Sequence, residues 1–271
     1  MPRRSSLKFA AAAWILAAAT PAVFAQWLNY PTPGVPLLPN GKPNLAAPAP
    51  RTADGKPDLS GMWGWETRVP CGAQCTDNQP GWAFLNLARN LKGGVPMLPA
   101  TAALVKERIA SLAKDDPNVH CQPRGAVRIL TDDYYKRLFQ LPGRLIILTE
   151  RNMQYRQIFT DGRPLPTDPN PTWNGYSTGK WEGDTLVVHT AGFRDGLWLD
   201  SAGHPLTSAG KVTEKFRRPN YGTLQVDITI DDPKAYTAPW TVQLNQPIVL
   251  NSELIDYFCE NEKDAVHMVG K

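Results

Sequence analysis

The first candidates for chemistry in this sequence are a histidine and an aspartate that share one short loop. His204 stands four positions after Asp200, between a glycine and a proline that restrict the backbone. A carboxylate at this spacing can orient an imidazole ring, and an oriented imidazole can act as a general base near neutral pH. The alternative interpretation of His204 is a histidine that caps the carbonyl groups of its own loop.

Glu214 is the next candidate because it lies on the apolar side of a predicted strand. Residues alternate along Lys211–Arg218, and this alternation groups Glu214 with the apolar side chains. An inward carboxylate is costly unless it is paired or hydrogen-bonded, so we expect a partner in Arg156, in Arg218 or in a histidine. The sequence leaves open whether Glu214 is a buried ion pair or a second acid–base group.

Aromatic residues are concentrated between Trp173 and Trp198, and they indicate a possible binding surface. Trp173 and Trp181 alternate onto one face with glycines between them. This pattern fits the lining of an apolar ligand cavity and fits a close-packed core equally well. The predicted ligand-binding residues are Arg156, Arg163, Trp173, Tyr176, Trp181 and His189.

These residues support two main hypotheses. The first is a protein that binds a small apolar or aromatic molecule in its interior. The second is a cofactor-free lyase, isomerase or hydrolase, with His204 as general base, Asp200 orienting it, and Glu214 as a second acid–base group. A third is an envelope scaffold protein that uses the N-terminal arm. Whether the protein is an enzyme stays open at this point.

Several well-known catalytic motifs are missing from the sequence. It contains no H-E-x-x-H, no G-x-S-x-G, no phosphate-binding G-x-x-x-x-G-K-[ST] and no G-x-G-x-x-G. These absences argue against a zinc protease of that type, an α/β-hydrolase, a P-loop enzyme and a nicotinamide enzyme. We therefore predict no cofactor and no metal site, and a small molecule as ligand or substrate.

The first 25 residues predict export. A basic start is followed by the apolar run Phe9–Ala19 and then by Val23-Phe24-Ala25, with small residues at the two positions that a signal peptidase reads, as in a cleaved signal peptide. No other stretch approaches the ~18 apolar residues of a membrane helix, so we expect a periplasmic or secreted protein with no membrane insertion. The signal holds three of the 29 basic residues, which leaves 26 against 25 acidic ones and no basic stripe for nucleic acid.

The cysteines Cys71, Cys75, Cys121 and Cys259 are even in number, and an exported chain favours disulfides over metal binding. Three pairings are possible. We favour Cys71 with Cys75, across a short loop, and Cys121 with Cys259, which would tie the C-terminal region to the middle of the chain.

The predicted organisation is a signal peptide at 1–25, a proline-rich extended arm at 26–58 and a single β-barrel-like domain at 59–271. Within the arm, Gly41–Leu45 and Gly55–Leu59 are a short internal echo. Proline fixes φ and removes a donor, so this arm cannot be helical. We expect it to wrap along the body, with docking to a partner as the alternative.

The body is predicted to be mainly β, with one amphipathic helix near 100–114 that packs on it. Tight turns between strands predict an antiparallel meander that forms a lipocalin-like barrel, with a two-sheet sandwich as the alternative. The predicted strands are Lys136–Leu141, Arg144–Glu150, Tyr155–Phe159, Gly175–Trp181, Thr185–Ala191, Lys211–Arg218, Thr223–Ile230, Trp240–Leu244 and Glu253–Phe258.

Three strings also resemble a large family of exported bacterial β-rich proteins. They are Arg156–Pro166, Trp181–Val188 and Cys259–Glu262, and the likeness extends over roughly Gly55 to Lys271. The resemblance implies export and a shared β-rich fold. It transfers no catalytic residue and no function, so every site assignment above rests on the residues themselves.

Overall fold

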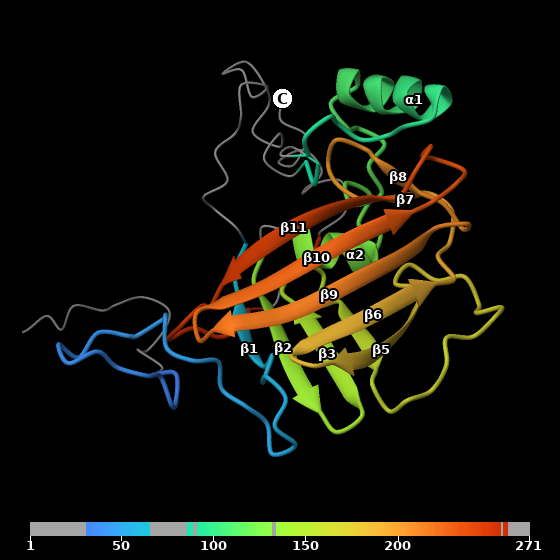
Figure 1. Ribbon diagram of the computed structural model, residues 1–271. Coiled ribbons are helices and arrows are strands. Elements are labelled where there is room, and N and C mark those ends of the chain that lie inside the picture. The colour runs from blue at the N-terminus through green and yellow to red at the C-terminus, as the bar shows by residue number, and fades with distance from the viewer. Residues whose placement is uncertain (1–30, 66–85, 89–90, 132–133, 256, 260–271) are drawn as a thin grey trace, which may run out of the picture.

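The computed structural model of the protein describes residues 31–65, 86–88, 91–131, 134–255 and 257–259 (Figure 1). The fold is mainly β, as predicted, and is built on one nine-stranded sheet with the order β1-β2-β3-β4-β5-β6-β9-β10-β11. The strands of this sheet are β1 (Gly61–Trp63), β2 (Lys136–Leu141), β3 (Arg144–Thr149), β4 (Tyr155–Phe159), β5 (Tyr176–Glu182), β6 (Thr185–Ala191), β9 (Lys211–Asn220), β10 (Thr223–Asp231) and β11 (Trp240–Pro247). A small second sheet pairs β7 (Leu197–Trp198) with β8 (Pro205–Leu206).

The two edges of the large sheet meet, so the sheet nearly closes into a barrel. The first strand, β1, pairs with β2 on one side and forms a bridge from Trp63 to Ile248 on the other, just after β11. Gly64 donates its N–H to the carbonyl of Pro247 at 2.8 Å, and Val249 donates to that of Met62 at 2.9 Å. Closure provides hydrogen-bond partners for backbone N–H and C=O groups of the edge strands that would otherwise be exposed. It favours the predicted barrel over the sandwich.

Two details of the predicted meander are wrong. Strands β4 and β5 pair in parallel, with Ile158 opposite Ser177, because the long connection of residues 160–175 carries the chain back before β5 begins. Glu253–Phe258 forms no strand; within its described residues Tyr257 makes an isolated bridge to Arg151. The sheet edge near this segment is already closed by the bridge from β1.

The predicted helix is present but shorter and differently buried. Helix α1 spans Pro99–Ala110 and ends before Leu112, whose φ of +55° is incompatible with continuing the helix. Its buried residues are Thr101 and Val105. Leu104 and Ile109, two apolar residues of this amphipathic helix, are more than a third exposed, so the expected packing of its apolar side on the body is wrong in part.

A second helix, α2 (Gly125–Thr131), was not predicted, and it fills the barrel. Every residue from Gly125 to Leu130 is buried. Its Ala126 carbonyl accepts from Arg156 of β4 at 3.4 Å, and its Leu130 carbonyl accepts from Gln246 of β11 at 2.5 Å. Because β4 and β11 are far apart in the sheet order, α2 connects two different walls. Seven residues are too few for a helical pattern to be read from the sequence.

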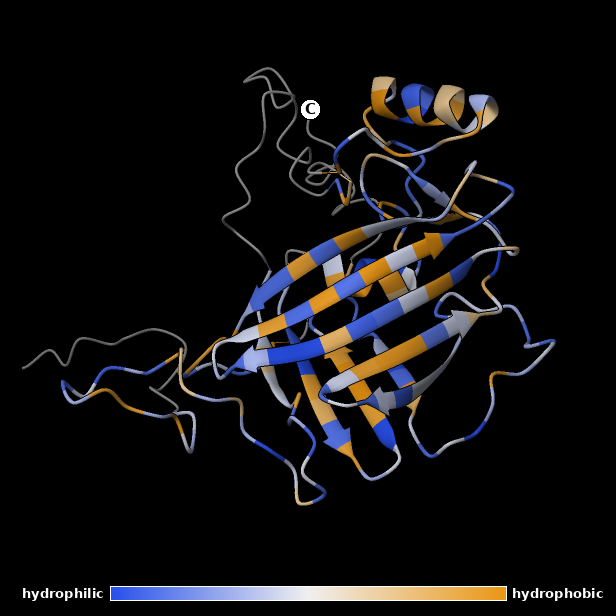
Figure 2. Cartoon of the chain, in the orientation of Figure 1, coloured by the Kyte–Doolittle hydropathy of each residue, from blue (hydrophilic) through white to orange (hydrophobic). Residues whose placement is uncertain are grey.

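The interior follows the alternation of the strands. Leu224, Val226, Ile228 and Ile230 of β10 are buried, and the side chains between them face outward, as predicted. Figure 2 shows the resulting alternation of apolar and polar residues along β10. Together with α2, these side chains form one continuous core. None of the described helices is long and apolar enough to cross a membrane.

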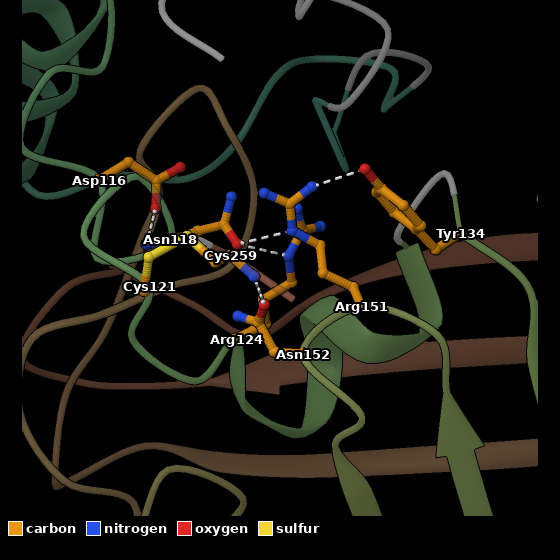
Figure 3. Close-up of a disulfide and its surroundings, with 8 residues drawn as sticks. All are labelled: Asp116, Asn118, Cys121, Arg124, Tyr134, Arg151, Asn152 and Cys259. Carbon is orange, nitrogen blue, oxygen red and sulfur yellow. Dashed lines mark hydrogen bonds between the residues drawn. A yellow bond between two sulfur atoms is a disulfide. The ribbon is translucent and has the colours of Figure 1, made fainter. Parts of the chain in front are cut away.

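The predicted disulfide between Cys121 and Cys259 is present, at an S–S distance of 2.04 Å (Figure 3). It attaches the described C-terminal residues to the loop before α2, and Cys259 also donates its N–H to the side chain of Asn152 at 3.0 Å. Near it, Asn118 accepts from the side chains of Arg124 and Arg151. Cys71 and Cys75 lie outside the described residues, so their pairing stays a prediction.

The internal echo corresponds to two hairpins with the same backbone scheme, which we call the first hairpin (residues 36–44) and the second hairpin (residues 50–58). Each is closed by three backbone hydrogen bonds between equivalent positions. These are Leu38 N to Lys42 O, Gly41 N to Leu38 O and Asn44 N to Pro36 O in the first, and Thr52 N to Lys56 O, Gly55 N to Thr52 O and Asp58 N to Pro50 O in the second. The arm is therefore two ordered turns rather than a plain extended segment.

Candidate functional site

The inward carboxylate of β9 is paired in the barrel interior. Glu214 accepts from Arg156 of β4 through both of its oxygens, with Nη1 to Oε1 at 2.8 Å and a second bond from Nη2 to Oε2. The side chains are 0% and 1% exposed, respectively. Of the three expected partners, the structure selects Arg156; Arg218 instead donates to the carbonyls of Asp58, Ser60 and Tyr221.

The other N–H groups of Arg156 also have acceptors. Ser177 of β5 accepts from Nη2 at 3.1 Å and from Nε at 3.4 Å, and Thr190 of β6 accepts from Nη2 at 3.0 Å. With the Ala126 carbonyl, every guanidinium nitrogen is bonded. This closed network joins four strands and α2, so Arg156 has no N–H left for a ligand.

The predicted pair of Asp200 and His204 forms in the loop between β7 and β8. The carboxylate Oδ2 lies 2.8 Å from Nδ1 of the ring, and both side chains are at least 95% buried. Asp200 also accepts backbone N–H groups from Leu87, Gly203 and His204 at 2.8 to 3.2 Å. These bonds fix the carboxylate, and the carboxylate in turn fixes the tautomer and orientation of the ring.

Electrostatics favour the charged form of this pair. Burial alone lowers the pKa of His204, but attraction and hydrogen bonding to Asp200 outweigh it and raise that pKa above its usual value. Burial likewise opposes charge on Asp200, yet the histidine and the backbone donors hold its pKa below the usual range. Within the described part of the chain, the ring of His204 makes one hydrogen bond, through Nδ1.

Two aromatic residues lie beside this histidine. The ring of Trp240, at the start of β11, has its centroid 6.2 Å from that of His204, and Tyr236 meets Trp240 edge-on at 5.4 Å. Tyr236 donates its hydroxyl to the carbonyl of Pro205 at 2.7 Å. The indole N–H of Trp240 is buried and lacks an acceptor among the residues described. A buried donor without an acceptor costs free energy, so it requires an explanation.

Arg108 of α1 brings a positive charge to the same place. Its guanidinium lies 4.3 Å from the ring of Trp198, and Nη1 donates to the carbonyl of Gly203 at 2.6 Å. Burial lowers the pKa of Arg108, and its positive charge works against the raised pKa of His204. We call this set of residues the His204 cluster: Arg108, Trp198, Asp200, His204, Tyr236 and Trp240.

The structure does not bring Glu214 to the other two predicted catalytic residues. Asp200 and His204 bond each other and their loop, whereas both oxygens of Glu214 bond Arg156. The two hydrogen-bond networks share no residue. A three-residue acid–base mechanism with Glu214 beside His204 therefore has no geometric basis.

The predicted ligand-binding residues are dispersed rather than grouped. Arg163 and Tyr176 lie on the outer surface, where Arg163 bonds Asp161 and the hydroxyl of Tyr176. His189 is exposed and contacts Thr213 on the outside, because its neighbours in β6 take the inward positions. Trp173 and Trp181 are half-buried and pack against the core.

Sequence reasoning missed Arg108, Trp198, Tyr236 and Trp240 as neighbours of His204. They come from α1, β7, the β10–β11 connection and β11, so no local spacing could show that they meet. Within the described residues no group of three or more His, Cys, Asp or Glu side chains is arranged to hold a metal ion. No family model matches the chain, and no curated protein matches it.

Proposed function

We propose that this protein is an exported binding protein for a small ligand that combines an aromatic or apolar body with an anionic group. The ligand binds at the end of the barrel where the His204 cluster lies. The observation that carries the proposal is the buried indole N–H of Trp240, which lacks an acceptor among the described residues. It lies beside His204, whose ring is hydrogen-bonded there only through Nδ1.

The donors of the cluster favour an anion. Because the pKa of His204 is raised, Nε2 carries a proton at mildly acidic pH and donates rather than accepts. Arg108 has one hydrogen bond within the described chain, to Gly203, and its other N–H groups remain for a ligand. Charge-assisted bonds from these groups to a carboxylate are stronger than neutral ones.

The aromatic side chains favour an apolar or aromatic body for the ligand. Trp198, Tyr236 and Trp240 supply large flat surfaces around the two cationic groups. Sites of this kind typically combine an apolar lining with a few fixed polar groups. The centre of the barrel is a weaker candidate, because α2 and the closed pair of Arg156 and Glu214 occupy it.

Export rests on two independent features. The N-terminal sequence has the pattern of a cleaved signal peptide. The disulfide between Cys121 and Cys259 is a cross-link that persists in oxidising compartments. Both features support a periplasmic or secreted location.

Acid–base catalysis is the second candidate function, and the fixed bond between Asp200 and His204 favours it. In that case the protein is a cofactor-free lyase, isomerase or hydrolase, with His204 acting at Nε2. Glu214 takes no part, because its oxygens are committed to Arg156. Turnover of a bound compound that is lost in His204→Gln would distinguish catalysis from binding alone.

The binding proposal is tested by calorimetric titration of the mature protein with benzoate and with benzyl alcohol, which share a ring but differ in charge. We expect benzoate to bind more tightly, and Arg108→Gln and His204→Gln each to weaken benzoate without affecting benzyl alcohol. Arg163→Gln is the matched control, since Arg163 is on the outer surface. The proposal fails if neither compound binds, or if Arg163→Gln weakens benzoate as much as Arg108→Gln does.

A further inference from the structure

The outer face of β2, β3 and β4 is unusually apolar. The strand register aligns its side chains in three rows, Arg137–Leu148–Tyr155, Phe139–Ile146–Gln157 and Leu141–Arg144–Phe159. We call its six apolar members, Phe139, Leu141, Ile146, Leu148, Tyr155 and Phe159, the apolar outer face. Phe139 is 37% exposed, Leu141 49% and Tyr155 60%.

This face contrasts with the opposite wall of the same barrel. The outward positions of β9, β10 and β11 carry lysine, arginine, threonine, glutamine, aspartate and asparagine side chains, with Pro219 in β9 and Pro247 at the end of β11. An antiparallel strand with one buried face normally has a polar outer face, and Figure 2 shows that β3 is instead apolar along most of its length. An exposed apolar surface of this kind, here interrupted by Arg137, Arg144 and Gln157, marks an interaction site.

The first hairpin carries a second exposed apolar surface. Leu37 is 63% exposed and Leu38 is 39% exposed. The segment after this hairpin is held at the β9–β10 turn, where Gly222 donates its N–H to Leu45 and Tyr221 donates to Ala47. In Figure 1 the hairpin projects from that end of the barrel.

The second hairpin shows that this turn is a docking element for the barrel. Arg51 makes a bidentate pair with Asp184 in the β5–β6 turn, and Lys56 donates to the carbonyl of Gly183. The position of Arg51 is taken by Leu37 in the first hairpin, so an apolar side chain replaces the charged contact. The first hairpin therefore suits an apolar surface, and the β5–β6 turn is already occupied.

We propose that the first hairpin docks on the apolar outer face of a second copy of this chain. Each copy offers one hairpin with exposed leucines and one outer face on which Phe139, Leu141 and Tyr155 stay exposed. Phe159 of that face is already covered by Tyr176, Arg144 and Arg163 of the same chain. Reciprocal exchange of hairpins between two copies buries both surfaces in an isologous dimer with a two-fold axis. This assembly is independent of ligand binding at the His204 cluster, which lies on other elements.

Sedimentation of the mature full-length protein over a range of concentrations tests the proposal. We expect a monomer–dimer equilibrium whose dissociation constant rises by about tenfold or more in Leu37→Asp/Leu38→Asp and in Phe139→Asp, because each places a charge in an apolar contact. Thr229→Asp, on the outward side of β10, is the matched control and should leave the equilibrium unchanged. A protein that stays monomeric, or a dimer insensitive to both variants, overturns the proposal.

Cross-linking provides a second readout that does not depend on how well the charged variants fold. Leu38→Cys and Leu141→Cys are prepared as separate proteins, mixed and oxidised. We expect a disulfide-linked heterodimer, and none when Leu38→Cys is mixed with Thr229→Cys. Equal cross-linking in the two mixtures, or none in either, contradicts docking of the hairpin on this face.

Discussion

Two buried acid–base pairs lie in this barrel and differ in how completely their hydrogen-bonding groups are used. Arg156 and Glu214 bond each other twice, and the remaining N–H groups of the arginine reach hydroxyl and carbonyl oxygens. Asp200 is equally well bonded, but in the described chain the ring of His204 is hydrogen-bonded only through Nδ1, which leaves Nε2 open. The first pair is closed, and the second is open at one atom.

The difference separates a structural pair from a candidate functional one. A closed pair in the interior holds elements together and offers nothing to a ligand. An open pair near the end of a barrel, with two tryptophans and an arginine around it, keeps a polar atom for something else. Burial and charge alone do not distinguish the two pairs, since both are almost fully buried.

The largest expected effect comes from breaking the closed pair. Glu214→Ala leaves the positive charge of Arg156 buried without its partner, and such a loss typically costs about 3–5 kcal/mol of unfolding free energy. Urea unfolding measures this change. The double variant Arg156→Met/Glu214→Leu removes both charges and should recover most of the loss. A double variant as unstable as Glu214→Ala would show that the unpaired charge of Arg156 does not cause the loss of stability.

Breaking the pair of Asp200 and His204 should cost less unfolding free energy, and it should change how stability depends on pH. Asp200→Asn keeps the shape of the side chain but removes its charge, and we expect a loss of about 1–3 kcal/mol. Because the pKa of His204 is raised in the folded state, its contribution to the free energy of unfolding is complete below about pH 6.5, the unfolded-state pKa of histidine. That contribution is lost as pH rises through the folded pKa of His204.

The lowered pKa of Asp200 has the opposite consequence. Its contribution is complete above about pH 3.9, the unfolded-state pKa of aspartate, and is lost as pH falls through its folded pKa. The wild type should therefore gain most stability from this pair between these two pH values, and should lose it as pH falls through the folded pKa of Asp200 or rises through that of His204. Unfolding at several pH values checks this, and a difference between wild type and Asp200→Asn that is the same at pH 5.5 and pH 9 would contradict it.

The two pairs also show how much the sequence could predict. Alternation placed Glu214 inward, and loop spacing paired Asp200 with His204, because both depend on neighbours in the chain. Three other features depend on the closure of the sheet. They are the choice of Arg156 among three partners for Glu214, the filling of the barrel by α2, and the approach of Arg108 and Trp240 to His204. No local pattern contains that information.

Trp240→Phe should affect ligand binding more than stability. Phenylalanine keeps most of the ring and removes an N–H that has no acceptor in the described residues, so we expect a change within about 1 kcal/mol in either direction. The affinity for benzoate should fall, because the indole donor is lost. Unfolding and titration of the same sample separate the two effects. A large loss of stability with unchanged affinity would mean that the Trp240 side chain has a structural role and does not contact the ligand.

The smallest effect is expected from the surface pair of Arg51 and Asp184, which serves as a baseline for both buried pairs. Each partner lowers the cost of charging the other, so the pKa of Asp184 is lowered and that of Arg51 is raised. Both side chains are more than half exposed, however, and water and salt screen such pairs. Asp184→Asn should leave the unfolding midpoint unchanged within error at physiological salt. A clear shift would mean that docking of the second hairpin stabilises the barrel, and that contacts at the surface contribute beside the two interior pairs.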